Sequence, residues 1–142
     1  MTNFNEHALE MSIMELFKDE EYTYVSGDQI HRERTEVLLT DDLKQYLYNR
    51  YAKDGITPSE VDSIILMLRN IGGTIYEANK AVFKLISDGF IFNREDRSQK
   101  DLYIELIDFS TPENNIFKAV NQFEIEGVNN QLRIPDGIVF VN

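Results

Sequence analysis

The sequence contains no cysteine and no tryptophan, and it is short of basic residues, proline and glycine. Without cysteine there is no disulfide framework and no thiolate site, and nothing indicates secretion. The 14 Lys and Arg residues stand against 25 Asp and Glu residues, so the formal net charge is −11. A chain this acidic is repelled by a DNA backbone unless its few cations cluster. The charge therefore weighs against free-standing nucleic-acid binding.

Long hydrophobic runs are absent as well. No apolar stretch approaches the roughly 20 residues that a membrane span needs. The N-terminus lacks the basic region and apolar stretch of a signal peptide. At 142 residues the chain is about one domain and is long enough to bury a core. We therefore expect a cytoplasmic globular protein or fragment with no membrane partner.

Hydrophobic periodicity predicts four helices in the first two thirds of the chain. The first covers residues 6–19, and capping signals at Thr40, Thr57 and Thr74 mark the starts of the other three. Gly89 is well suited to end the last helix. The residues expected to face a core are Leu9, Ile13, Leu16 and Phe17, then Leu43, Leu47 and Tyr51, then Val61, Ile64, Ile65 and Leu68, and finally Ala78, Ala81, Val82, Leu85 and Ile86.

Three consecutive strands are predicted after the helices. Residues 102–109 alternate loosely, residues 116–126 form a longer strand, and residues 138–141 are an apolar run typical of a strand buried on both faces. Helices followed by a run of strands indicate an α+β fold, and we expect an antiparallel meander.

Asp136 lies at the turn that precedes the last strand. Pro135 fixes its own φ and Gly137 tolerates a positive φ, so the backbone changes direction around Asp136. A carboxylate at the start of a buried strand is a common way to present a metal ligand, although an ordinary turn has the same sequence. A single aspartate also makes an incomplete magnesium site, because Mg²⁺ is usually held by one or two carboxylates and substrate phosphate.

Glu77 is the candidate partner of Asp136, because its helix comes directly before the predicted strands. As the fourth residue of Thr74-Ile75-Tyr76-Glu77 it can instead close a capping box. The two roles are compatible if the N-terminus of that helix faces the site, so the sequence leaves both open.

Other common site patterns are missing from the sequence. His7 and His31 are too isolated to predict a zinc site. There is no Ser–His–acid grouping, no glycine-rich phosphate loop and no Gly-Lys-Ser/Thr. The cations Arg94, Arg97, Lys100 and Arg133 could contact phosphates, although scattered loop cations are usually just solvated.

Seven sequence segments are informative through the identity of their residues and not only through their spacing. They are residues 22–28 and 31–39, Glu77-Ala78-Asn79, residues 85–89, residues 106–109 running into 112–115, residues 120–123, and Pro135-Asp136 ahead of residues 138–142. In this order they resemble the N-terminal region of the R subunits of type I restriction enzymes. The resemblance runs from about residue 22 to the end of the chain.

The resemblance implies N-terminal helices followed by the truncated core of a PD-(D/E)xK, restriction-endonuclease-like fold. In that arrangement residues 1–73 form a helical region packed on the core, and residues 74–142 are the first part of the nuclease core. Asp136 matches the metal-binding aspartate and Glu77 matches a helix glutamate near the site, so these two are the implied catalytic residues. Ile134 between Arg133 and Pro135 departs from the expected pattern and leaves a role for Arg133 in doubt.

The family's full-length enzyme is expected to cleave unmodified foreign DNA by Mg²⁺-dependent phosphodiester hydrolysis, coupled to ATP-driven translocation. Its partners are DNA and the modification and specificity subunits of the restriction complex. The Glu-x-Lys half of the site and the ATP-binding motor domains are not among these 142 residues, so we expect the fragment itself to be inactive.

A protein-interaction module is the alternative function. The net charge of −11 suits an immunity protein or a DNA mimic that inhibits a nuclease. Such a mimic should gather its acids on one face, whereas cations such as Arg32, Lys44 and Lys80 interrupt the acids here.

Overall fold

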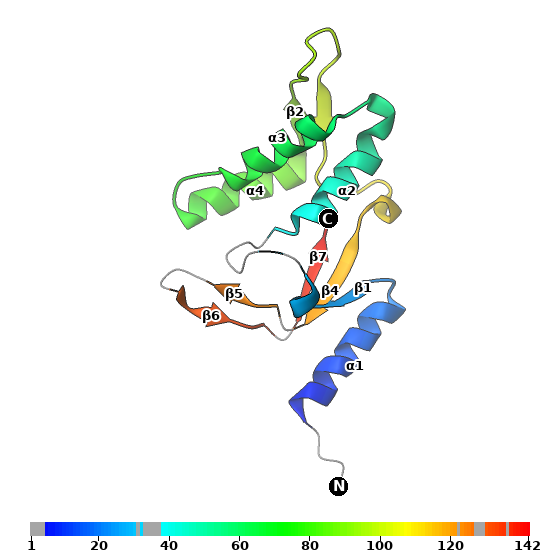
Figure 1. Ribbon diagram of the computed structural model, residues 1–142, viewed down its shortest axis with the longest axis vertical. Helices are drawn as coiled ribbons and strands as arrows, with labels where there is room; N and C mark the ends of the chain where they lie inside the picture. Colours follow the sequence, from blue (N-terminus) through cyan, green and yellow to red (C-terminus); the bar gives the residue numbers. More distant parts are fainter. Residues whose placement is uncertain (1–4, 31, 33–37, 122, 127–129, 136) are drawn as a thin grey trace. The chain divides into compact units, whose positions relative to one another are not determined.

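In the computed structural model, the described residues are 5–30, 32, 38–121, 123–126, 130–135 and 137–142 (Figure 1). The chain divides into two compact units, Met1–Leu39 with Ile116–Val141 as unit 1, and Thr40–Asn115 with Asn142 as unit 2. The described residues form four α-helices and several small sheets, so the predicted α+β class is confirmed. The division into residues 1–73 and 74–142 stays a prediction.

Unit 1 contains a three-stranded sheet with the order β1-β4-β7. Its strands are β1 (Thr23–Ser26), β4 (Phe117–Asn121) and β7 (Gly137–Val141). β4 runs parallel to β1 and antiparallel to β7. The short strands β5 (Ile125–Glu126) and β6 (Leu132–Arg133) pair separately.

The predicted meander is therefore wrong. Within residues 102–109 only β3 (Leu102–Ile104) is a strand, and it pairs with β2 (Phe90–Phe92) instead of β4. The stretch 116–126 is also two strands, β4 and β5, and not one. The second neighbour of the central strand β4 is β1, a strand from the N-terminal part of the chain.

The core of unit 1 forms around Leu39, Val120 and Phe123, with Ile138 and Phe140 packed against them. β7 follows a simple alternation, because Ile138 and Phe140 are half-buried and Val139 is 41% exposed. The expectation of a strand buried on both faces is therefore wrong. β7 is an edge strand of the described sheet, so one of its hydrogen-bonding edges has no partner strand among the described residues.

Helix α1 (Glu6–Asp19) begins at Asn5, whose Oδ1 accepts a hydrogen bond from the Ala8 N–H at 2.7 Å. The helix packs against β1 and β4. Its buried residues are Glu10 and Met14, whereas Leu9, Ile13 and Leu16 of the predicted stripe are exposed and its fourth member, Phe17, is half-buried. The helix was predicted correctly, but its buried face is displaced by one residue along the sequence.

Unit 2 begins with α2 (Thr40–Tyr51), the 3₁₀ helix η2 (Ala52–Asp54) and α3 (Pro58–Arg69). The two α-helices contact each other, and all their predicted core residues are buried. Thr57 and Glu60 form the predicted capping box at the start of α3. Among the described residues, none of the helices has the length and apolar character that crossing a membrane requires.

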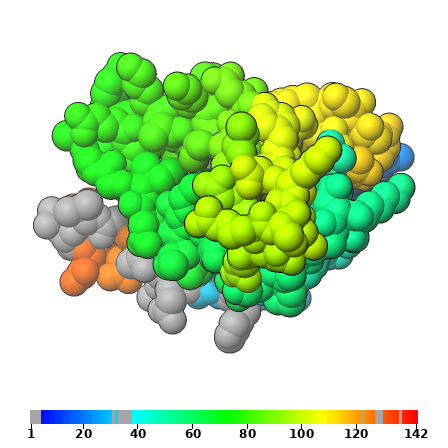
Figure 2. All heavy atoms as spheres, turned by 90° about the horizontal axis from the view of Figure 1, so that it is seen from above, coloured from blue at the N-terminus to red at the C-terminus, as the bar shows by residue number. Residues whose placement is uncertain are grey.

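Helix α4 (Ile75–Asp88) differs from its prediction, because it has no fully buried residue. Val82, Leu85 and Ile86 of the predicted core face are only half-buried, and Ala81 is exposed. Phe83 is exposed as well. In Figure 2 the green atoms of α3 and α4 form a broad part of the visible surface. The apolar period of this helix was recognised, but its burial was overestimated.

Candidate functional site

Asp136, the predicted metal ligand, lies outside the described residues, and its two neighbours Pro135 and Gly137 are described. Gly137 begins β7 and pairs with Asn121 at the end of β4. A Cβ at position 137 would lie 2.7 Å from Cε of Met14, so α1 approaches this point of the sheet closely. The surroundings of Asp136 that the structure describes are therefore those at the start of β7.

A hollow of about 210 Å³ opens beside Gly137. Its lining residues are Glu10, Ile13, Met14, Phe17, Gly137 and Val139. Glu10 is the one charged residue among them, and it is 7% exposed. A carboxylate that is withdrawn from water costs free energy unless it is paired or coordinates a metal. Glu10 therefore places a carboxylate, which has an interaction partner, on the buried face of α1 beside Gly137.

Asn121 provides a second buried polar group at the same end of the sheet. Its Oδ1 accepts a hydrogen bond from the Tyr24 hydroxyl at 2.9 Å, and its Nδ2 lies 4.0 Å from Sδ of Met11. Because Asn121 is the cross-strand partner of Gly137, its side-chain amide is held close to the start of β7.

Glu10 and Asn121 were both missed at the level of sequence. Glu10 lies at helical spacing from Met14 and Phe17, and Phe17 is also a member of the predicted, more hydrophobic stripe. An acidic residue four positions before a methionine is a weak signal by itself. The close contact between Met14 and Gly137, which identifies the buried face, joins residues far apart in the sequence.

Glu77 closes the capping box of α4. Its backbone N–H donates to Oγ1 of Thr74 at 3.2 Å, and its Oε2 accepts from the Thr74 N–H at 3.1 Å. The capping alternative is therefore confirmed, and Glu77 is exposed and belongs to unit 2. Its pairing with Asp136 stays a prediction. Within the part of the chain that the structure describes, no group of three or more His, Cys, Asp or Glu is arranged to hold a metal ion.

Asp108 organises a second polar region, inside unit 2, and is 1% exposed. Its Oδ1 accepts from the N–H groups of Ser110 and Thr111 at 3.1 and 2.9 Å. Its Oδ2 accepts from Nδ2 of Asn114 at 2.9 Å and lies 3.1 Å from Nε of Arg50. The Asn114 side chain and these other donors hold the pKa of Asp108 below its usual value. The network fixes the 3₁₀ helix η3 (Pro112–Asn114) on the end of α2.

Arg94, a candidate for phosphate contacts, is instead buried in a structural ion pair with Glu60. Its side chain therefore holds the fold of unit 2 and is not exposed to a ligand. Arg97 and Lys100 are exposed loop cations.

Comparison with known proteins gives a consistent result. A family model described as the N terminus of type I restriction enzyme R proteins matches residues 3–142. The chain is 30% identical over 130 residues to the HindI endonuclease subunit, a type I restriction enzyme subunit of Haemophilus influenzae. It is 27% identical over 147 residues to a putative type I restriction enzyme MjaIXP endonuclease subunit of Methanocaldococcus jannaschii.

These matches cover most of the chain but little of the relatives. They include 86% and 96% of the chain, and 12% and 14% of the two relatives respectively. The chain thus corresponds to a small part of each relative's length.

Proposed function

Because the chain belongs to the family of type I restriction enzyme R protein N termini, as its sequence blocks predicted, we propose that it is the nuclease region of such a subunit. The complete R subunit then cleaves unmodified foreign DNA by Mg²⁺-dependent hydrolysis of a phosphodiester, coupled to ATP-driven translocation. It acts together with the modification and specificity subunits. The names of both relatives, which are endonuclease subunits, support this proposal.

The observation that carries the proposal is the buried carboxylate of Glu10 beside Gly137, the residue that follows Asp136. Oxygen atoms of carboxylates and amides are the ligands that Mg²⁺ prefers. Glu10 and Asn121 offer such oxygens at the start of β7, so the donor set at this place fits the ion that the family implies.

In this proposal Asp136 is the principal metal ligand and Glu10 supplies a second carboxylate. Asn121, held by Tyr24, is a fixed polar group on the strand opposite. Ile13, Phe17 and Val139 form apolar walls of the hollow and limit the access of water to the carboxylate. When bound, Mg²⁺ supplies charge stabilisation at the scissile phosphate and lowers the pKa of a water molecule.

Glu77 keeps in this proposal the catalytic role that the family resemblance implies. The substitution Glu77→Gln separates this role from the cap, because glutamine also closes a capping box but carries no charge. Loss of cleavage with unchanged stability supports an active-site role. Unchanged cleavage leaves Glu77 with its cap alone.

The test uses the complete R subunit assembled with its partner subunits. We expect Asp136→Asn to abolish Mg²⁺-dependent DNA cleavage and to leave ATP hydrolysis intact. Asp28→Asn, which neutralises an exposed acid of the same unit, is the matched control and should cleave normally. Cleavage by Asp136→Asn at the rate of the control contradicts the proposal.

The acidic interaction module remains the second candidate because of the net charge of −11. The gene's continuation discriminates between the two. A Glu-x-Lys within roughly 20 residues after Asn142, which is about the span of a hairpin, supports the nuclease. Inhibition of a nuclease by the purified chain supports the module.

A further inference from the structure

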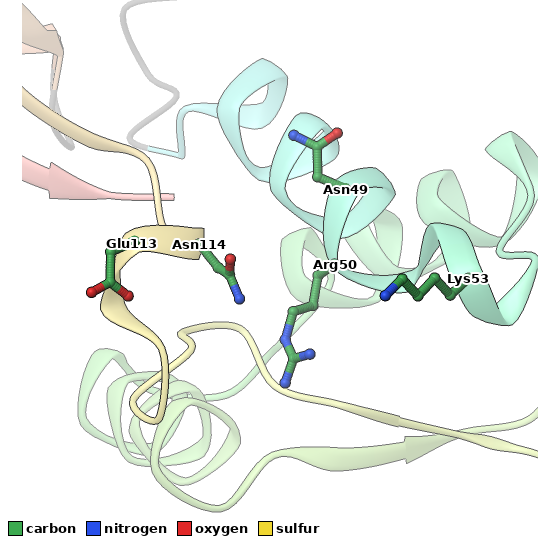
Figure 3. Close-up of a pocket in the computed structure, with 5 residues that line it drawn as sticks. All are labelled: Asn49, Arg50, Lys53, Glu113 and Asn114. Atoms are coloured by element: carbon green, nitrogen blue, oxygen red, sulfur yellow. The ribbon is translucent and has the colours of Figure 1, made fainter.

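A second hollow, of about 410 Å³, lies within unit 2 (Figure 3). It is lined by Asn49, Arg50 and Lys53 from the end of α2 and from η2, and by Glu113 and Asn114 from η3. Its volume is in the range of small-ligand sites, which are mostly apolar, but all five lining residues here are polar. Such a hollow suits a charged group and not an apolar molecule.

The side chains that enter the hollow carry hydrogen-bond donors. Figure 3 shows the Arg50 guanidinium, the Lys53 ammonium and the Asn114 amide extending toward the same space, while the Glu113 carboxylate points away. Arginine and lysine can only donate hydrogen bonds, and the amide NH₂ has two donors. The expected ligand is therefore an acceptor with several oxygens, which a phosphate group provides.

Arg50 is held in place before any ligand arrives. Its Nε lies 3.1 Å from Oδ2 of Asp108, and its guanidinium carbon lies 5.7 Å from the centre of the Tyr51 ring. Asp108 is in turn held by three hydrogen-bond donors. A side chain that is already ordered loses less conformational entropy on binding than a free one.

The local charge selects among phosphate groups. Asp108 offsets the charge of Arg50, whereas Lys53 is exposed and makes no ion pair with any residue that the structure describes. With Glu113 also in the lining, the two positive charges of Arg50 and Lys53 stand against two negative charges, so the hollow is about neutral and favours a monoanion over a dianion. A phosphodiester carries a single negative charge, and a phosphate monoester or inorganic phosphate carries more than one near neutral pH.

We propose that this hollow binds the phosphate of a phosphodiester, such as one in a DNA strand. This contact uses none of the residues of the proposed metal centre in unit 1. It rests on the proposed function only in naming DNA as the source of the phosphodiester. It positions a strand, and it carries no base specificity, because phosphate contacts fix register without reading sequence.

The test is a nuclear magnetic resonance titration of the isotope-labelled chain with three ligands at low salt. These are dimethyl phosphate, inorganic phosphate and a short DNA duplex. Dimethyl phosphate and the duplex should both shift the side-chain amide signals of Asn49 and Asn114. The two ligands should also compete with each other for the hollow.

Two lysine variants with the same charge change show whether the hollow is responsible. Lys53→Gln should weaken duplex binding and lower the slope of log K against log salt by about 1. Lys44→Gln removes a lysine of α2 that is ion-paired with Asp62 at 3.2 Å, and it should leave the Asn114 shifts unchanged. Lys53 is exposed, so its variant should fold even if Arg50→Gln does not.

The proposal is overturned if no ligand shifts Asn114, if inorganic phosphate alone does so, or if the two lysine variants weaken binding equally. None of these measurements uses a metal ion. Asp136→Asn should bind the duplex at the hollow as the unaltered chain does. If the hollow does not bind a phosphodiester, the nuclease proposal is unaffected. If the nuclease proposal is wrong, binding of dimethyl phosphate to the hollow is still expected.

Discussion

Arg94 donates hydrogen bonds to both carboxylate oxygens of Glu60, from Nε to Oε2 at 2.8 Å and from Nη2 to Oε1 at 3.2 Å. The same guanidinium donates to the carbonyl oxygens of Asp54 and Gly55, each at 3.0 Å. Glu60 also accepts from the Thr57 N–H as part of the cap of α3. One buried ion pair therefore joins the loop after β2 to the start of α3.

Replacing one partner of this ion pair should be costly. Arg94→Met leaves a buried carboxylate without its cation, which typically costs about 3–5 kcal/mol. Urea denaturation measures the loss in the free energy of unfolding. The exposed pair Lys44–Asp62 is the control, because removing such a surface pair with Lys44→Gln typically costs less than about 1 kcal/mol. Similar losses in both variants would contradict the structural role assigned to Arg94.

Stability should fall on acidification. Burial would raise the pKa of Glu60, but hydrogen bonds from Arg94 and from backbone N–H groups outweigh burial and lower it below its ordinary 4.5. The pKa of Asp108 is lowered below its ordinary 3.8 by Asn114 and its other donors. Both groups thus contribute stability that is fully present above these ordinary values and is lost as pH falls through the lower folded values.

The pH dependence is measured as the urea midpoint from pH 7 downward. We expect a plateau above about pH 5 and a fall below the ordinary values of the two carboxyls. Asp108→Asn should remove part of the fall. A midpoint that rises as the pH is lowered below 4.5 would show that the carboxylates are not stabilised by folding.

Gly89 should resist substitution. It has φ +68° and ψ −172°, a region that is essentially restricted to glycine. An added Cβ would also lie 2.7 Å from the carbonyl oxygen of Ile104. We expect Gly89→Ala to cost about 1–3 kcal/mol in thermal unfolding. Gly72→Ala is the control, because a Cβ there meets nothing within 4 Å, and an equal loss in both would reject the explanation.

Much of unit 2 could be predicted because its signals are local. The caps at Thr57 and Thr74 and the apolar stripes of α2 and α3 lie within single helices, and the structure confirms them. The sheet of unit 1 could not be predicted in the same way. Its parallel pairing joins Thr23 to Lys118 and Tyr24 to Ala119, and no local pattern specifies such a contact.

The candidate site shows the same limit. The resemblance identified Asp136 from a short block, whereas Glu10 is brought to Gly137 only through the approach of α1 to the start of β7. The predicted stripe of Leu9, Ile13, Leu16 and Phe17 shares Phe17 with the face of Glu10 and Met14, and its other three members are more hydrophobic than those two residues. Hydrophobicity therefore favoured the wrong face, and a buried acid is the kind of local conflict that functional sites produce.

The proposed metal centre makes a direct prediction for Glu10. Glu10→Gln should weaken binding of a divalent cation at the start of β7, because it removes a carboxylate ligand. Glu15→Gln removes an exposed acid from the same helix and should have no effect. Equal cation binding by the two variants would remove Glu10 from the centre and leave Asp136 in it.

The central claim is that a divalent cation is held at Asp136. The most direct measurement is paramagnetic broadening of the amide signals of the labelled chain by Mn²⁺, a stand-in for Mg²⁺ that also detects weak binding. We predict broadening centred on Gly137 and on Glu10 of α1, lost in Asp136→Asn and retained in Asp28→Asn. Broadening that spares Gly137, or that persists unchanged in Asp136→Asn, would contradict the account.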